Sequence, residues 1–74
     1  MEKIKVLAQF DGTKVKPLAF RRGPHLYKNL KLNMVYHFRE GEQNIWRFSV
    51  SDNANSYQLR FETDLLQWYI EEEV

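Results

Sequence analysis

The sequence predicts an all-β protein: a single small, bent antiparallel meander or partly open barrel of five to six strands, SH3-like in size. The first observation is a period of two, because fourteen alternating positions are apolar or aromatic and mostly polar residues separate them. Successive side chains of a strand point to opposite faces, so this period indicates half-buried strands. Tight-turn signals separate the runs, and no segment has a convincing helical period. The alternating positions are Leu30, Leu32, Met34, Tyr36, Phe38, Trp46, Phe48, Val50, Tyr57, Leu59, Phe61, Leu66, Trp68 and Ile70.

Turn residues divide the chain into six expected strands. Asp11-Gly12 is the strongest hairpin signal, because a type I′ turn needs positive φ at both of its central residues. Turns at 23–25 and 63–64 and polar loops at 40–44 and 52–56 separate the other strands. The expected strands are residues 2–10, 13–22, 26–39, 45–51, 57–62 and 65–72.

Two of these strands need an irregularity. The large residues Leu18 and Phe20 are out of phase with the hairpin register, and a bulge near Lys16-Pro17 removes the conflict because one extra residue exchanges the two faces. The third strand is long enough to need a bend around Lys28-Asn29.

The loop at 40–44 sets the expected register of the next hairpin. It pairs Phe38 with Trp46 and His37 with Arg47. We expect the core to centre on Trp46, Phe48, Phe38, Leu59, Phe61 and Trp68.

A series of aromatic and basic motifs runs through residues 16–70. It consists of the run Lys16–Gly23, Tyr27, the segment Tyr36–Arg39, and the motifs Trp46-x-Phe48-x-Val50, Tyr57-x-Leu59-x-Phe61 and Trp68-x-Ile70. Together these motifs resemble a family of small, uncharacterised bacterial all-β domains of unassigned function. The chain departs from the family pattern at Asn29, where the family has a valine, and at Tyr36 or Phe38, where it has a tryptophan. The resemblance implies an all-β fold and a bacterial cytoplasmic origin, and it transfers no functional residues.

The 74 residues are expected to form one β-barrel-like domain, residues 1–74. Cysteine is absent, so aromatic bulk must supply the core in place of disulfides or thiolate–metal sites. No apolar run reads as a signal peptide or reaches the roughly 20 residues of a membrane span, so we expect a cytoplasmic protein that does not enter a membrane.

Charge is distributed unevenly along the chain. Residues 1–39 hold nine Lys or Arg and two acids, whereas residues 40–74 hold two Arg and eight acids. The asymmetry indicates either a basic partner-binding half with an acidic tail, or a first strand that lies beside the last. We favour the second interpretation, which places Lys3 and Lys5 opposite Glu71, Glu72 and Glu73, because sheet edges usually need closing.

The residues do not indicate an enzyme. No nucleophile motif is present, and His25 in a turn and His37 on a strand read as ordinary surface residues. Two histidines twelve residues apart do not match the ligand spacing of zinc sites, and the glycines do not form a phosphate-binding cluster. We therefore expect no catalytic, metal-binding or cofactor-binding residues and no cofactor.

Two binding hypotheses remain. A basic and aromatic sheet face of His37, Arg39, Arg47, Arg60 and Tyr69, extended by Arg21, Arg22, Lys28 and Lys31, has the residue types that bind single-stranded nucleic acid. The alternative for this face is a set of solvated ion pairs, in which Arg47 meets Glu62 and Arg60 meets a nearby acid.

The preferred hypothesis is a non-catalytic binding or accessory module that acts through protein–protein contacts or self-association. Four apolar residues have the outward phase of such an interface, namely Val35, Ile45, Leu65 and Tyr69. The edge of the second strand beyond Pro17 can also accept a partner strand. This hypothesis needs no unusual charge and fits a sequence pI of about 8.0, whereas dedicated nucleic-acid binders usually exceed about 9.

Overall fold

The chain folds into an antiparallel sheet of seven strands, without a helix, in the part that the structure describes. The structure is a computed structural model that describes residues 1–73, with the backbone alone for residues 72 and 73. The strands are β1 (Glu2–Asp11), β2 (Lys14–Arg22), β3 (His25–Tyr27), β4 (Lys31–Glu40), β5 (Gln43–Ser51), β6 (Ser56–Glu62) and β7 (Gln67–Glu73).

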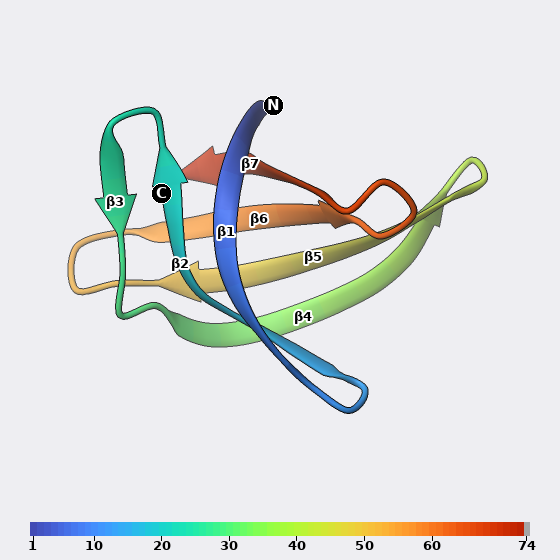
Figure 1. The fold of residues 1–74 in the computed structure, drawn as a ribbon, viewed down its shortest axis with the longest axis horizontal. Coiled ribbons are helices and arrows are strands. Elements are labelled where there is room, and N and C mark those ends of the chain that lie inside the picture. Colours follow the sequence, from blue (N-terminus) through green and yellow to red (C-terminus); the bar gives the residue numbers. More distant parts are fainter. Residues whose placement is uncertain (74) are drawn as a thin grey trace.

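The sheet curls into a half-barrel. Its strand order is β3-β2-β1-β7-β6-β5-β4, so β1 joins β7 and the outer edges of β3 and β4 remain unpaired. β1 and β2 cross the long strands β4, β5 and β6 in Figure 1. One backbone hydrogen bond, in which the amide of Leu30 donates to the carbonyl of Leu18 over 3.3 Å, links the start of β4 to β2. The all-β, partly open architecture predicted from the sequence is confirmed.

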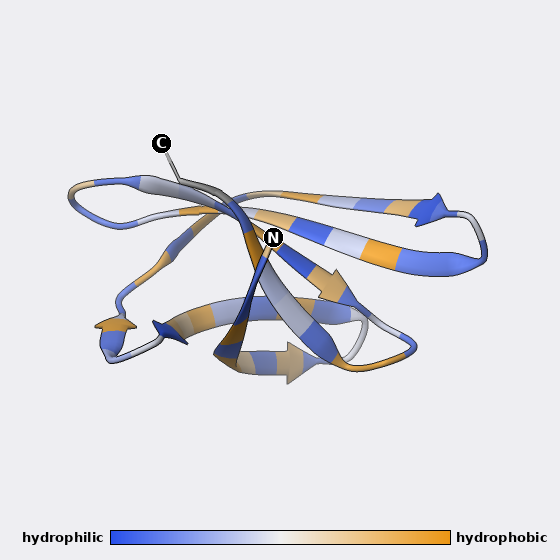
Figure 2. Ribbon diagram, turned by 90° about the horizontal axis from the view of Figure 1, so that it is seen from above, coloured by the Kyte–Doolittle hydropathy of each residue, from blue (hydrophilic) through white to orange (hydrophobic). Residues whose placement is uncertain are grey.

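The inner face of the curved sheet holds the core. Hydrophobic and hydrophilic bands alternate along the ribbons in Figure 2, as half-buried strands require. Aromatic rings pack against one another in this core: Phe61 stacks on Trp68 with centroids 4.4 Å apart, and Phe20 stacks on Tyr27 at 4.6 Å. The buried core consists of Ile4, Val15, Phe20, Leu30, Phe48, Val50, Tyr57, Leu59, Phe61, Trp68 and Ile70.

The first strand lies beside the last, as the sequence predicted, but the expected charge pairing is wrong. Lys3 lies opposite Tyr69 and Glu2 lies opposite Ile70, so the register displaces the lysines from the acidic end of β7. Glu71 instead accepts a hydrogen bond from Arg47. Contacts of the side chains of residues 72 and 73 lie outside the described residues.

Two residues with positive φ change the expected strands, and the first of them explains why the strand count is seven instead of five or six. Asn29 has a φ of 57° and ends β3, so the expected long third strand is two strands, β3 and β4. Leu66 has a φ of 55° and lies in the turn before β7, where it is 72% exposed. The prediction that Leu66 continues the alternation of Trp68 and Ile70 is therefore wrong, because a left-handed residue does not continue a strand.

The predicted bulge in β2 is present, one residue further on. Ala8 pairs with Pro17 and Leu7 pairs with Ala19, which leaves Leu18 as the extra residue. Val15, Pro17 and Phe20 are buried, so the strand changes phase between residues 17 and 20 as the bulge requires.

A second bulge, at Asn33 in β4, was not predicted. Leu32 pairs with Val50 and Met34 pairs with Ser49, so the period of two is interrupted between them. Met34, Tyr36 and Phe38 therefore lie on the outer face, and Met34 and Tyr36 are 51% and 47% exposed. Placing Phe38 at the centre of the core was wrong for this reason.

The hairpin between β4 and β5 has a two-residue turn, Gly41-Glu42, instead of the expected five-residue loop. Glu40 pairs with Gln43, which brings His37 opposite Trp46 and Phe38 opposite Ile45. Both pairs assigned from the sequence are off by one residue. Trp46 packs against the core but is only partly buried.

Candidate functional site

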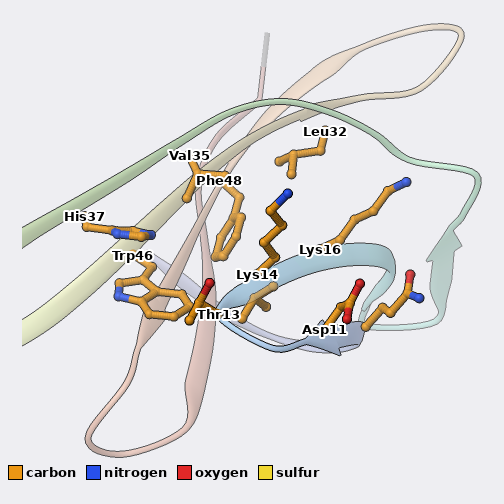
Figure 3. A pocket seen from close by; sticks show the side chains of 11 residues that line it. Asp11, Thr13, Lys14, Lys16, Leu32, Val35, His37, Trp46 and Phe48 are labelled. Atoms are coloured by element: carbon orange, nitrogen blue, oxygen red, sulfur yellow. The ribbon is translucent and has the colours of Figure 1, made fainter.

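A groove of about 440 Å³ lies on the open side of the half-barrel. It separates the tip of the β1–β2 hairpin from the inner face of β4 and β5 (Figure 3). We call it the seam groove, and its lining residues are Gln9, Asp11, Thr13, Lys14, Val15, Lys16, Leu32, Val35, His37, Trp46 and Phe48.

The floor of the seam groove is apolar and aromatic. The rings of His37 and Trp46 stack with centroids 4.6 Å apart, and Trp46 meets Phe48 and Phe61 edge to face at 6.4 and 6.1 Å. Phe48 is fully buried, whereas Trp46 is partly accessible. These contacts fix the indole ring while one part of it stays accessible from the groove.

The rim of the seam groove is cationic. Lys14 and Lys16 extend from β2 toward β4 in Figure 3, and the lining residues include one acid, Asp11. A ligand that carries carboxylates beside apolar side chains would match both the rim and the floor.

The unpaired edge of β4 borders the groove. Its central segment, residues 34–38, reads Met-Val-Tyr-His-Phe and contains no proline and no formal charge. Three of these residues, Met34, Val35 and Tyr36, are 51%, 37% and 47% exposed. Natural sheet edges are usually protected by lysine, proline or a bulge, and here the bulge at Asn33 protects only one end. We call this segment the free edge.

The arginines predicted to bind nucleic acid lie on the outer face of the C-terminal strands. Arg47 and Arg60 are directly opposite each other on β5 and β6, and Arg60 is opposite Tyr69. His37 has the inner phase beside Trp46, and Arg39 is paired with Asn44 at the end of the same hairpin. The structure therefore brings three of the five predicted residues together and separates the other two.

Carboxylates surround both arginines on this face. The guanidinium of Arg60 donates to Glu40 through two nitrogens, each 3.2 Å from an oxygen, and to Glu62 over 3.0 Å. Arg47 donates to Glu71 over 2.6 and 3.3 Å, and its guanidinium carbon lies 4.8 Å from the centroid of Phe38. The expectation that Arg60 pairs with a nearby acid is confirmed, whereas Arg47 pairs with Glu71 in place of Glu62.

The ion pairs change the acidity of their members. Hydrogen bonds and positive charge from Arg60 hold the pKa of Glu40 below its ordinary value of 4.5. The hydrogen bond to Glu40 raises the pKa of Arg60, although the burial of its side chain opposes that shift. In the loop between β5 and β6, the backbone amides of Asn55 and Ala54 donate hydrogen bonds to Asp52 and lower the pKa of its carboxyl group.

The four residues predicted for a protein interface do not form one patch. Val35 faces the seam groove, whereas Ile45 is fully buried. Leu65 is 57% exposed in the turn before β7, and Tyr69 is partly buried beside Arg60. Only Val35 contributes to the groove.

Sequence reasoning missed Lys14, Lys16 and the His37–Trp46 stack. One signal was available: Met34 and Val35 are adjacent apolar residues inside an alternating run, and such a break indicates a bulge. The cationic rim had no local signal, because it arises where residues 9–16 meet residues 32–48.

Comparison of the chain with protein-family models, curated proteins and solved structures finds no match. The family resemblance drawn from the sequence therefore remains a prediction. Among the described residues no group of three or more His, Asp or Glu could hold a metal ion. The described residues also contain no helix that is long and apolar enough to cross a membrane.

Proposed function

We propose that this protein is a non-catalytic binding module that captures an extended segment of a partner protein as an added strand on β4. The observation that carries this proposal is the free edge, an uncharged strand segment with unpaired backbone that borders the seam groove. In strand addition, main-chain hydrogen bonds supply affinity and alternate side chains enter pockets.

The groove provides the second half of this recognition. A strand paired with β4 would direct every other side chain to the inner face, toward Val35 and the accessible part of Trp46. Burying one aliphatic side chain there contributes about 1.5–3 kcal/mol, and each main-chain hydrogen bond contributes about 0.5–1.5 kcal/mol. Ordering the segment costs about 2–5 kcal/mol, so we expect affinities of about micromolar strength.

Single-stranded nucleic acid is the second candidate, and one observation favours it. Tyr36 is 47% exposed and lines a hollow of about 520 Å³ with Arg47, Gln58 and Glu71. Arginine beside an exposed aromatic ring is typical of strand-stacking surfaces. Glu71 lies within the same hollow, however, and its carboxylate opposes a phosphate at Arg47. We therefore rank this function second.

Fluorescence anisotropy with a labelled, capped Thr-Val-Thr-Val-Thr-Val-Thr peptide tests strand capture. We expect binding that changes little between about 50 and 200 mM salt, because the peptide has no charge. Val35→Lys should weaken binding at least tenfold, because a charge at the free edge opposes strand pairing. Leu65→Lys is the matched control, since Leu65 is exposed in a turn away from the groove, and it should leave binding unchanged.

A second peptide is N-methylated at alternate residues. It lacks the main-chain N–H donors along one edge of the extended peptide, and its side chains are the same. If this peptide binds as well as the first, strand addition is wrong and the groove recognises side chains alone. Oligothymidylate is the probe for the second candidate. If it binds more tightly than either peptide, and if this affinity falls steeply with salt and in an Arg47→Gln variant, nucleic-acid binding replaces strand capture as the proposed function.

A further inference from the structure

The outer face of β1, β2 and β3 contains two like charges directly opposite each other. Lys5 on β1 pairs with Arg21 on β2, and both side chains are exposed. Ile4, Val6 and Phe20 alternate with them and point inward, which fixes Lys5 and Arg21 on the outer face. Like charges at directly opposite positions destabilise a sheet.

No carboxylate compensates this pair in the part of the chain that the structure describes. The nearby acid Glu2 accepts a 2.8 Å hydrogen bond from Arg22 instead. The comparable pair Arg47 and Arg60, in contrast, is surrounded by three glutamates. Among the described residues, Lys5 and Arg21 thus present a site for an anion that no carboxylate occupies.

An apolar hollow of about 440 Å³ lies beside the two cations. Leu7 is opposite Ala19, and Leu26 is opposite Arg21 on the next strand. The small side chain of Ala19 leaves space between Leu7 and Leu26, which are 65% and 53% exposed. We call this set the outer hollow: Lys5, Leu7, Ala19, Arg21, Leu26 and Lys28 line it together with Val6 and Phe20.

We infer that the outer hollow is a docking site for an acidic protein surface, in which one carboxylate lies between Lys5 and Arg21 and a neighbouring aliphatic side chain fills the space over Ala19. Charge complementarity indicates a negatively charged partner surface, since three cations and no acid line the hollow. The apolar centre with a charged rim has the composition of protein interfaces. The site lies on the opposite face of the sheet from the seam groove and does not depend on it.

The residues of the hollow favour a protein over the other anionic partners. None of the exposed side chains that line it is aromatic, so it offers no platform on which a nucleobase could stack. The space between Leu7 and Leu26 accommodates an aliphatic side chain of a protein, and the vesicle measurement below tests for a lipid surface separately.

Amide chemical-shift titration of the isotopically labelled protein tests the inference. The probe is a capped Asp-Glu-Leu-Glu-Asp peptide, and we expect weak, saturable shifts at the amides of Lys5, Ala19, Arg21 and Leu26. Replacing the leucine of the peptide by serine should weaken binding at least tenfold, because the hollow then stays empty. Arg21→Gln should weaken it about three- to fivefold, as for an exposed ion pair.

Lys31→Gln is the control variant, because Lys31 is an exposed cation on β4 outside the hollow. It should leave the affinity unchanged. Equal binding of the leucine and serine peptides would overturn the inference, and so would equal affinity of the Arg21→Gln and Lys31→Gln variants. Tighter binding of phosphatidylserine vesicles or oligothymidylate, lost in Arg21→Gln, would also overturn it by assigning the face to another partner.

Discussion

Two cross-strand pairs of like charge show how differently the halves of this molecule use their cations. Lys5 and Arg21 face each other on β1 and β2, and Arg47 and Arg60 face each other on β5 and β6. The first pair is exposed and has no acidic partner among the described residues, whereas Arg60 is 3% exposed among carboxylates. The same residue pattern therefore forms an open surface in one half and part of the folded framework in the other.

The comparison also resolves the charge asymmetry of the sequence. Acids of the C-terminal half neutralise the arginines of that same half, as Glu71 does for Arg47 and Glu62 does for Arg60. In the basic N-terminal half, Lys5 and Arg21 remain exposed on the outer face of β1 and β2, and Lys14 and Lys16 line the seam groove. The interpretation set aside at the sequence level, a basic half available to a partner, is the one that the outer hollow supports.

Removing Arg60 should have the largest effect. Arg60→Ala removes the cation that pairs with the nearly buried carboxylate of Glu62, while Glu71 keeps its pair with Arg47. We expect a loss of about 3 kcal/mol in the free energy of unfolding. Urea denaturation measures this loss. Arg21→Ala is the matched control and should cost nothing, so equal losses in both variants would contradict the distinction between the two pairs.

Reversing a charge in the exposed pair should have a smaller effect of the opposite sign. Arg21→Glu turns the contact with Lys5 into an attraction, which should stabilise the domain by about 0.2–1 kcal/mol. The gain should shrink as salt rises from about 0.01 to 0.15 M, because exposed charges are screened. Thermal melts at both salt concentrations check this, and a destabilised variant would show that Arg21 has a partner in the fold.

The pH dependence of the Glu40–Arg60 pair should be the smallest effect, because the Glu40 side chain is 62% exposed. Arg60 lowers the pKa of Glu40 in the folded state, so the pair stabilises the protein above the ordinary value of 4.5 and this contribution is lost as pH falls below it. Glu40→Gln should therefore melt at a lower temperature than the natural protein at pH 7, and the difference in melting temperature should narrow as the pH falls below 4.5. A constant difference across that range would mean that Glu40 does not titrate with the pair.

The period of two predicted the strands whose backbone is regular. Phe48, Leu59 and Phe61 lie in the core where the alternation places them, because β5 and β6 pair without a break at these positions. The prediction failed where a single residue interrupts the alternation of inward and outward side chains. The bulge at Asn33 exposes Met34 and Tyr36, and the left-handed Leu66 shortens the last strand.

The candidate site could be predicted from the sequence less completely than the fold could. The seam groove exists because the sheet curls and brings the tip of the first hairpin over β4 and β5. Neither the curvature nor the two-residue turn that pairs His37 with Trp46 follows from hydrophobic periodicity. The free edge likewise depends on the strand order, which leaves β4 at the end of the sheet.

Hydrogen exchange at the amides of residues 34–38 tests the central proposal most directly. The measurement compares the protein alone with the protein saturated by the Thr-Val peptide, and the Val35→Lys variant at the same peptide concentration is the weakly binding reference. Strand capture predicts that hydrogen exchange slows at least tenfold at those amides of the free edge that point away from β5. Exchange at the amides of the β6–β7 turn should not change. Unchanged exchange in β4 at saturating peptide would contradict strand capture, whatever the affinity.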